Sequence, residues 1–246
     1  LWLRAKLSFD NARHEDTLTQ TDALIARLAQ VQLEPVLAAE VASTGRLLKA
    51  QALFELGRDD EGAALLDRLR ADFRDSRAAT YSYLVQASRQ ARRGELATAQ
   101  KTLTDMVDAK RAGEYGAFAL FEAAAYAERQ GLDRNLREAY TLLERLVENY
   151  PRDELVFYAR LKQGDLLRKL NDFGAARLVY EDLINNRGQH PDVLLAQVAL
   201  ADSLFAQGAN NPGNYESAAA TYERLRDLPA APTDLRVEAG YKWGYA

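Results

Sequence analysis

FYARLKQGDLLRKLNDFGAARLVYEDL, residues 157–183, contains two segments with helical periodicity joined by a short corner. Gly164 and Leu167 share one face of the first segment, whereas Ala176, Tyr180 and Leu183 share one face of the second. Residues three or four positions apart lie on the same side of an α-helix. The spacing therefore predicts two amphipathic helices that cross at small residues and pack larger apolar side chains around the crossing.

The pattern of the second segment recurs along the chain. A small residue is followed four and seven residues later by apolar residues, and these sets repeat at intervals of about 40 residues. The small residues are Gly62, Ala99, Ala139, Ala176 and Ala218, and their apolar partners are Leu66 and Leu69, Leu103 and Met106, Leu143 and Leu146, Tyr180 and Leu183, and Tyr222 and Leu225. One hairpin alone cannot bury its apolar face, so the recurrence predicts a stack of five hairpins.

A helix is expected before each small residue, over about 36–56, 76–93, 115–130, 154–170 and 191–207. Gly57, Gly94, Gly131, Gly208 and Asn171 follow these helices, and they are predicted to take the left-handed conformation that ends a helix.

The two ends of the chain are less regular. Residues 1–11 and 16–31 are predicted to form one more hairpin, with Ala23, Ile25 and Leu28 on its buried side. Residues 233–246 have the pattern of the first helix of a further repeat. We therefore expect the chain to be part of something longer.

The predicted fold class is all-α, a right-handed superhelical array of antiparallel helical hairpins. No change in composition marks a domain boundary, so residues 1–246 are expected to form a single repeat domain. Its parts are a hairpin at 1–35, repeats at about 36–75, 76–113, 114–151, 152–190 and 191–232, and a partial repeat at 233–246.

Composition excludes several classes of function. The chain has no cysteine, so it has no disulfide and no cysteine nucleophile or metal ligand. Its net charge of −4 lacks the basic excess typical of proteins that bind nucleic acid. No apolar run is long enough to predict a membrane span.

No motif predicts catalysis, a metal site or a cofactor. The phosphate-binding glycine loops and the GxSxG nucleophile motif are missing. His14 and His190 belong to different units and are expected to be surface residues. The acidic runs 59–61 and 153–154 fall at helix starts, where carboxylates cap free N–H groups and favour the helix dipole. We therefore predict that the chain is not an enzyme.

Basic side chains gather in three places: at 89–93, at Arg68, Arg70, Arg74 and Arg77, and at Lys162, Arg168 and Lys169. Acidic residues are interspersed with most of them, which is typical of a solvated helix face. A site for an acidic partner is the alternative.

The repeat resembles the tetratricopeptide repeat. Gly164 and Leu167 occupy that family's Gly and Tyr positions on the first helix, and Ala176 and Tyr180 occupy its Ala and Phe positions on the second. Arg160 stands at the family's Trp position, so the repeat is divergent. Related helical-hairpin repeats of the Sel1-like type are the alternative. The chain is also similar to repeats of bacterial envelope lipoproteins and assembly factors, which implies a bacterial periplasmic or envelope location.

The resemblance implies that the first helices line a concave groove for a peptide or a partner helix. The groove residues would be Tyr81, Leu84, Ser88, Phe118, Phe121, Glu122, Tyr158, Leu161, Asp165, Arg168, Lys169, Asp202 and Phe205. The alternative is that several of them only pack between adjacent repeats.

The predicted function is therefore a non-catalytic scaffold that binds a protein or peptide segment on its concave face, as part of a larger assembly. Two alternatives are a structural array that self-associates through its ends and a regulatory segment of a longer protein whose activity lies elsewhere. We expect the chain to bind neither nucleic acid nor a cofactor, and we expect no membrane span in this segment.

Overall fold

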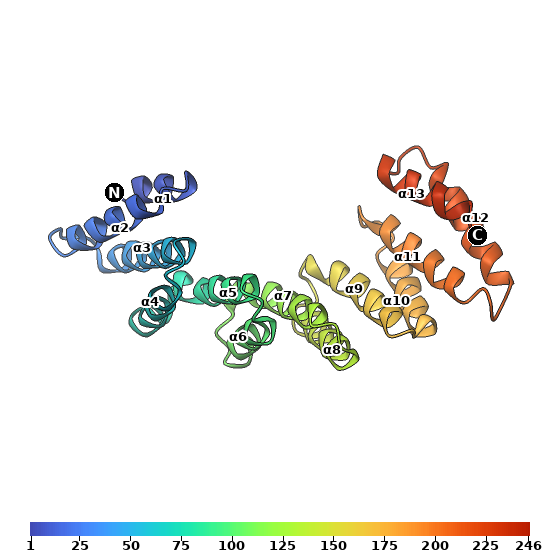
Figure 1. The fold of residues 1–246 in the computed structure, drawn as a ribbon, viewed down its shortest axis with the longest axis horizontal. Helices are drawn as coiled ribbons and strands as arrows, with labels where there is room; N and C mark the ends of the chain where they lie inside the picture. Colours follow the sequence, from blue (N-terminus) through green and yellow to red (C-terminus); the bar gives the residue numbers. More distant parts are fainter. The chain divides into compact units, whose positions relative to one another are not determined.

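The computed structural model describes residues 1–246 and contains helices and no strand, which confirms the all-α class (Figure 1). The N-terminal elements are α1 (Trp2–Asp10), α2 (His14–Leu28), α3 (Pro35–Glu55), α4 (Asp59–Asp72), α5 (Arg77–Arg92), α6 (Leu96–Asp108) and the 3-10 turn η1 (Gly113–Tyr115). The C-terminal elements are α7 (Gly116–Arg129), α8 (Asp133–Asn149), α9 (Leu155–Lys169), α10 (Phe173–Asn186), α11 (Val193–Ala206), α12 (Gly213–Arg226) and α13 (Thr233–Trp243).

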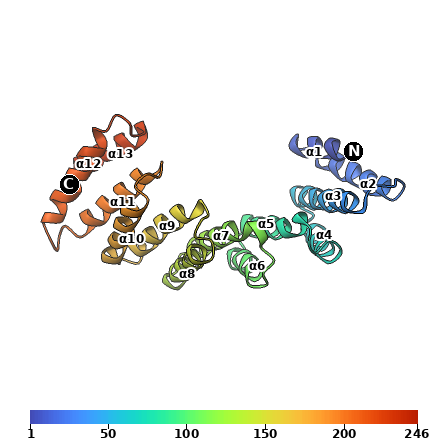
Figure 2. The ribbon, with the colours of Figure 1, turned by 180° about the vertical axis from the view of Figure 1, so that it is seen from behind.

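The chain packs as two compact units, residues 1–119 and residues 120–246. In the first unit α1 pairs with α2, α3 with α4 and α5 with α6, and α3 also packs against α5. In the second unit α9 pairs with α10 and α11 with α12, and α13 packs against α12. Figure 2 shows the same helix pairs from behind. A single domain over 1–246 stays a prediction.

The predicted repeat pattern is confirmed by burial in all five hairpins. All five small residues are buried, as are all ten apolar residues that follow them. Tyr180 and Leu143 are fully buried, and Tyr222 is 2% exposed. The spacing of four and seven residues therefore identifies the face of each second helix that packs inside the array.

Close packing explains why the crossing points need small residues. A Cβ atom added to Gly164 would lie 2.3 Å from Cε1 of Tyr180, and one added to Gly62 would lie 2.5 Å from Cε1 of Phe54. Real Cβ atoms do not approach other atoms so closely. Each glycine therefore admits an aromatic ring of its own hairpin, which brings the two helices together.

Left-handed residues end most of the first helices, as predicted. Gly57, Gly94 and Gly131 have φ angles of 74°, 82° and 79°, and Asn171 has a φ of 60°. The same prediction is wrong for Gly208, which is buried and has no positive φ. An added Cβ there would lie 2.3 Å from the ring of Tyr215, so this glycine makes room for an aromatic side chain.

The N-terminal hairpin is present, but its predicted buried face is only partly right. Ala23 is exposed, and Ile25 and Leu28 are half-buried. The buried residues of this stripe are Thr17, Thr21 and Leu24 of α2. The hydroxyl groups of Thr17 and Thr21 donate to the carbonyl oxygens of Arg13 and Thr17 at 3.0 and 2.9 Å. Because these bonds satisfy the hydroxyls, threonine can occupy the buried stripe in place of an aliphatic residue.

The predicted capping is wrong for the acidic start of α4, whereas the predicted position beside the N-terminal end of the helix dipole is confirmed. No side chain caps this helix, although Asp59, Asp60 and Glu61 lie in its first turn. Asp59 instead forms a two-point ion pair with Arg89 of α5, with Nη2 and Oδ2 3.0 Å apart, and Arg93 lies 3.3 Å from the same carboxylate. The pair therefore links the second helix of one hairpin to the first helix of the next. At the other acidic run, Asp153 does accept a bond from the Leu155 backbone nitrogen.

The partial repeat forms the predicted helix, α13. Leu235 and Ala239 of α13 join Val198 and Leu225 in one buried cluster, so this helix is packed as the earlier first helices are. No helix of the chain is both long enough and apolar enough to cross a membrane.

Candidate binding surface

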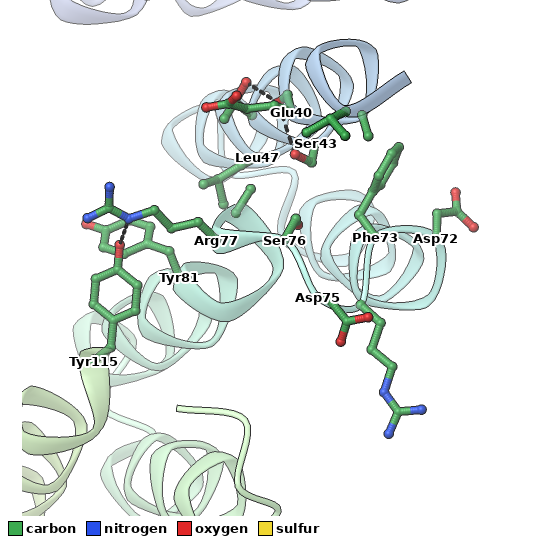
Figure 3. A pocket seen from close by; sticks show the side chains of 15 residues that line it. Glu40, Ser43, Leu47, Asp72, Phe73, Asp75, Ser76, Arg77, Tyr81 and Tyr115 are labelled. Carbon is green, nitrogen blue, oxygen red and sulfur yellow. Dashed lines mark hydrogen bonds between the residues drawn. The ribbon is translucent and has the colours of Figure 1, made fainter. Parts of the chain in front are cut away.

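An open cleft of about 730 Å³ lies in the first unit between α3, the corner after α4 and the start of α5 (Figure 3). Val36, Leu47 and Phe73 give it an apolar lining, and Tyr81 and Tyr115 stand at one end. Glu40, Asp75 and Arg77 are among its charged residues. The cleft therefore offers apolar surface with charges of both signs around it.

The aromatic end of the cleft is held by several contacts. The rings of Tyr81 and Tyr115 lie 5.5 Å apart between centroids. Nε of Arg77 donates to the Tyr115 hydroxyl at 3.0 Å and lies 2.6 Å from a carboxylate oxygen of Glu114. Figure 3 shows the bond between Arg77 and Tyr115 as a dashed line. These contacts fix the orientation of the rings before any partner binds.

A second pocket of about 500 Å³ lies in the other unit, between the C-terminal parts of α9, α11 and α13. Its charged lining consists of Arg168, Asp202 and Lys242. Its aromatic lining is provided by Phe205, Tyr222, Tyr241 and Tyr245, of which Tyr241 and Tyr245 are 67% and 68% exposed.

Asp202 is the centre of the charges in this pocket. It accepts a 2.6 Å bond from the Tyr222 hydroxyl, and it lies 3.3 Å from Nη2 of Arg168 and 2.9 Å from Nζ of Lys242. The three partners come from α12, α9 and α13. Burial by itself would lower the pKa of Lys242, but bonds to Glu238 and Asp202 outweigh it and raise that pKa. Lys242 is therefore charged at neutral pH.

A further carboxylate joins α7 to α9. Glu128 accepts bonds from Lys162 at 2.7 Å and from Lys169. Burial alone would raise the pKa of Glu128, but the two lysines outweigh it and hold that pKa below its usual range. Two of the basic residues predicted to form a solvated face are thus used to join successive first helices.

The predicted groove residues fall into two groups in the structure. Six line a pocket or are exposed: Tyr81 lines the first cleft, Arg168, Asp202 and Phe205 line the second pocket, and Phe118 and Lys169 are exposed. The others are buried or half-buried, namely Leu84, Ser88, Phe121, Glu122, Tyr158, Leu161 and Asp165.

Several residues of the second group serve the packing of the array. Leu84 is only 7% exposed, and Leu161 packs against two adjacent buried clusters. Asp165 accepts a bond from the Tyr180 hydroxyl, and Tyr158 donates one to Asp192. The alternative of packing between adjacent repeats thus describes Tyr158 and Leu161, whereas Asp165 is bonded within its own hairpin.

Sequence reasoning missed most of the residues that line the two pockets. Val36, Thr44, Leu47 and Phe73 in the first and Tyr241 in the second were not among the predicted sites. A signal for Thr44 was present. Ala50 and Ala87 are buried small residues of the first helices α3 and α5, and Thr44 stands six residues before Ala50 as Tyr81 stands six before Ala87. No periodicity identifies Phe73, which lies in a corner.

The two histidines are half-buried rather than fully at the surface. The ring of His190 stacks on Phe157 with centroids 3.7 Å apart and planes at 3°. Its Nδ1 accepts a 3.1 Å bond from the backbone nitrogen of Asp192. No group of three or more His, Asp or Glu side chains is arranged to hold a metal ion.

Comparison with known proteins gives the same architecture. The family model for the tetratricopeptide repeat matches residues 46–76 and 158–190, which cover most of the α3–α4 and α9–α10 hairpins. The C-terminal part of a repeat-containing protein of this type from Cytophaga hutchinsonii superposes with a TM-score of 0.64 at 14% identity, covering 99% of this chain and 82% of that one. BtubC (BKLC) from P. vanneervenii has a TM-score of 0.54 at 13% identity, covering 89% and 94%. Comparison with curated protein sequences found no match.

These findings define the class as a helical-hairpin solenoid. The chain is a divergent tetratricopeptide-like repeat protein. Repeats of this type generally mediate contacts between proteins and generally act as non-catalytic scaffolds.

Proposed function

We propose that this chain is a non-catalytic scaffold that binds a protein or peptide segment on the surface formed by its first helices. One observation carries the proposal: the open pockets of both units lie between first helices of successive hairpins. The first lies between α3 and α5, and the second between α9, α11 and α13. The first hollow lies at the start of α5 and the second at the C-terminal ends of α9, α11 and α13, so each unit offers its own surface to a segment of a partner.

The lining of the pockets suits a peptide better than a small reactive substrate. Tyr and Arg side chains, which dominate binding energy at many protein interfaces, stand at both sites. Tyr81, Tyr115 and Arg77 already hold one another in the free chain. Binding would therefore order few side chains of the scaffold, which reduces its entropic cost.

The proposal is tested by selecting binders from a displayed random-peptide library on the wild-type chain. The affinity of the selected peptides is then measured for Tyr81→Ala in the first cleft and Tyr241→Ala in the second pocket. Leu178→Ala is the matched control, because Leu178 is 64% exposed on α10, a second helix. We expect each peptide to lose affinity for one pocket variant and to bind the control normally. Peptides that bind both pocket variants normally would contradict the proposal.

Self-association is the second candidate function, and it has its own observation. Exposed apolar side chains gather at both terminal helices: Leu3 and Leu7 on α1 are 64% and 51% exposed, and Val237 on α13 is 67% exposed. Sedimentation velocity over a range of concentrations would detect it. Larger species that disappear in Leu3→Glu or Val237→Glu would favour this function, and a concentration-independent monomer would exclude it.

A further inference from the structure

Three arginines converge at a small pocket on α4 and α5, beside the first cleft. The pocket is lined by Arg70, Arg74 and Arg111, together with Ala79, Thr80 and Tyr83. Arg70 is at the end of α4, Arg74 lies in the corner that follows, and Arg111 follows α6. Two of these arginines belong to a basic cluster that the sequence alone assigned to a solvated face.

Tyr83 of α5 organises the pocket. The guanidinium carbon of Arg70 lies 3.9 Å from the centroid of the Tyr83 ring, and Nη1 of Arg111 donates to the Tyr83 hydroxyl at 3.1 Å. Arg70 is fixed further by bonds from Nε to Ser82 at 2.8 Å and from Nη2 to Gln86 at 2.7 Å. Two guanidinium groups are thus held in place by neutral partners.

The charge at this pocket is poorly compensated. Its lining contains three guanidinium groups and two hydroxyl groups, but no carboxylate. The one acidic partner of Arg70 is Asp67, at 3.1 Å, whose side chain is 72% exposed and therefore well screened by water. Arg74 is exposed and takes part in no ion pair. This excess of positive charge occurs on a chain of net charge −4.

The excess of positive charge is most unfavourable at Arg70, because this side chain is largely buried. Its side chain is 14% exposed. Burial lowers the pKa of Arg70; Tyr83 and Asp67 oppose this shift only in part, and the positive charge of Arg111 adds to it. Arginine remains charged in proteins, so burying Arg70 beside another positive charge destabilises the free chain. A bound anion would reduce this destabilisation.

We propose that this pocket binds the phosphate group of a phosphorylated protein segment. A phosphate monoester carries close to two negative charges and three acceptor oxygens, which matches several guanidinium and hydroxyl donors better than a single carboxylate does. The pocket is small, at about 20 Å³, which is room for about one water molecule, so a phosphate group would rest at its mouth and a run of phosphates would not fit. The acidic chain around it disfavours nucleic acid, whose binding depends on many basic contacts.

The inference that the phosphate belongs to a protein rests on the proposed scaffold function. Arg74 lines both this pocket and the first cleft. A segment bound in the cleft would therefore lie beside Arg74, which also lines the phosphate pocket.

The first test measures the binding of inorganic phosphate by calorimetric titration at constant ionic strength, with acetate as the carboxylate probe. We expect phosphate to bind more tightly than acetate, and to bind Arg74→Gln or Arg111→Gln about tenfold more weakly, because each variant removes charged hydrogen bonds. Arg68→Gln is the matched control, because Arg68 is exposed on α4 and does not line the pocket. Equal binding of phosphate and acetate, or an equal loss in Arg68→Gln, would overturn the proposal.

The second test identifies the source of the phosphate. Degenerate peptides centred on phosphoserine or phosphothreonine are compared with glutamate-centred peptides and with a single-stranded oligonucleotide. We expect only the phosphopeptides to bind, and Arg74→Gln to reduce that binding. Binding of the oligonucleotide alone would overturn the assignment to a protein.

The same assays separate this inference from the proposed function. Tyr81→Ala should retain its affinity for inorganic phosphate, because Tyr81 lines the cleft and not the arginine pocket. If phosphate binds through the arginines but no peptide of any kind binds the chain, the scaffold function and the protein source fail while the anion pocket stands. If unphosphorylated peptides bind the cleft and phosphate does not bind, the pocket fails alone.

Discussion

Tyr180 on α10 donates a 2.7 Å hydrogen bond to Asp165 on α9, across the interior of one hairpin. Tyr222 on α12 makes the equivalent bond to Asp202 on α11, at 2.6 Å. Each aspartate directly follows the small residue of its first helix, Gly164 or Ala201. Arg168 lies 4.0 Å from Asp165 and 3.3 Å from Asp202. The bond therefore recurs in the α9–α10 and α11–α12 hairpins, and Arg168 joins its two copies.

Removing the Tyr180 hydroxyl should destabilise the chain measurably. In Tyr180→Phe the Asp165 carboxylate loses a donor, but its side chain is 38% exposed and water can replace part of the bond, so we expect a loss of about 0.5–1.5 kcal/mol in the free energy of unfolding. Tyr180→Ala also leaves a cavity at a fully buried site and should cost about 3–5 kcal/mol. Leu143→Ala should cost about 2–5 kcal/mol for the same reason. Urea unfolding measures these changes in the free energy of unfolding. An unfolding curve unchanged by Tyr180→Ala would refute the repeat register.

Adding one methyl group at Gly164 should also destabilise the chain. The new Cβ would lie 2.3 Å from the Tyr180 ring, which must then move within a packed interior. We expect Gly164→Ala to cost about 1–3 kcal/mol in the free energy of unfolding. Gly174→Ala on α10 is the control, because its Cβ would come no closer than 3.9 Å to any side chain. That variant should be neutral or slightly more stable, since alanine favours helix, and a comparable loss in both would contradict the argument.

The stability of the chain should fall at alkaline pH. Burial and the bonds to Asp165 and Asp202 raise the pKa values of Tyr180 and Tyr222 well above their ordinary value. In the unfolded chain these tyrosines release their protons at pH about 10, whereas the folded chain retains them. Above that pH the folded state holds more protons, so the free energy of unfolding decreases as pH rises. The stabilisation that these two protonated tyrosines provide is fully present below pH about 10.

Denaturant unfolding at a series of alkaline pH values, followed with near-ultraviolet absorbance, measures this effect. Tyrosine ionisation should accompany unfolding. The double variant Tyr180→Phe with Tyr222→Phe should show a weaker dependence on pH over that range. An unchanged slope in the double variant would show that other groups cause the decrease.

The ion pair between Asp59 and Arg89 should make a modest contribution that is lost in acid. The bond from Arg89 lowers the pKa of Asp59, so the stabilisation is present above the unfolded value of about 3.9 and is lost as pH falls through the folded value. Asp59→Asn should cost about 1 kcal/mol at neutral pH, since the pair is two-pointed and partly buried. Thermal melts with Asp60→Asn as the control test this, because Asp60 is exposed in the same turn. A larger loss in Asp60→Asn would contradict it.

Some of the candidate surface could be predicted from the sequence and some could not. Tyr81, Arg168 and Asp202 were found because the repeat register places them on first helices, and they do line pockets. Leu84 and Leu161 share that register, but Leu84 is buried and Leu161 packs against neighbouring helices. Periodicity identifies the side of a helix that packs within its own hairpin, but the stacking of the next hairpin decides how much of the other side is covered.

The sequence by itself determined the helices, the hairpins and the residues at their crossings, because spacings of three and four and the need for small residues at close contacts are local requirements. Only the tertiary structure decided which charges meet. Arg70, Arg74 and Arg111 come from three segments, and Asp202 collects partners from α9, α12 and α13. Such groups depend on how hairpins stack, and stacking is set by contacts between residues far apart in the chain that no local spacing records.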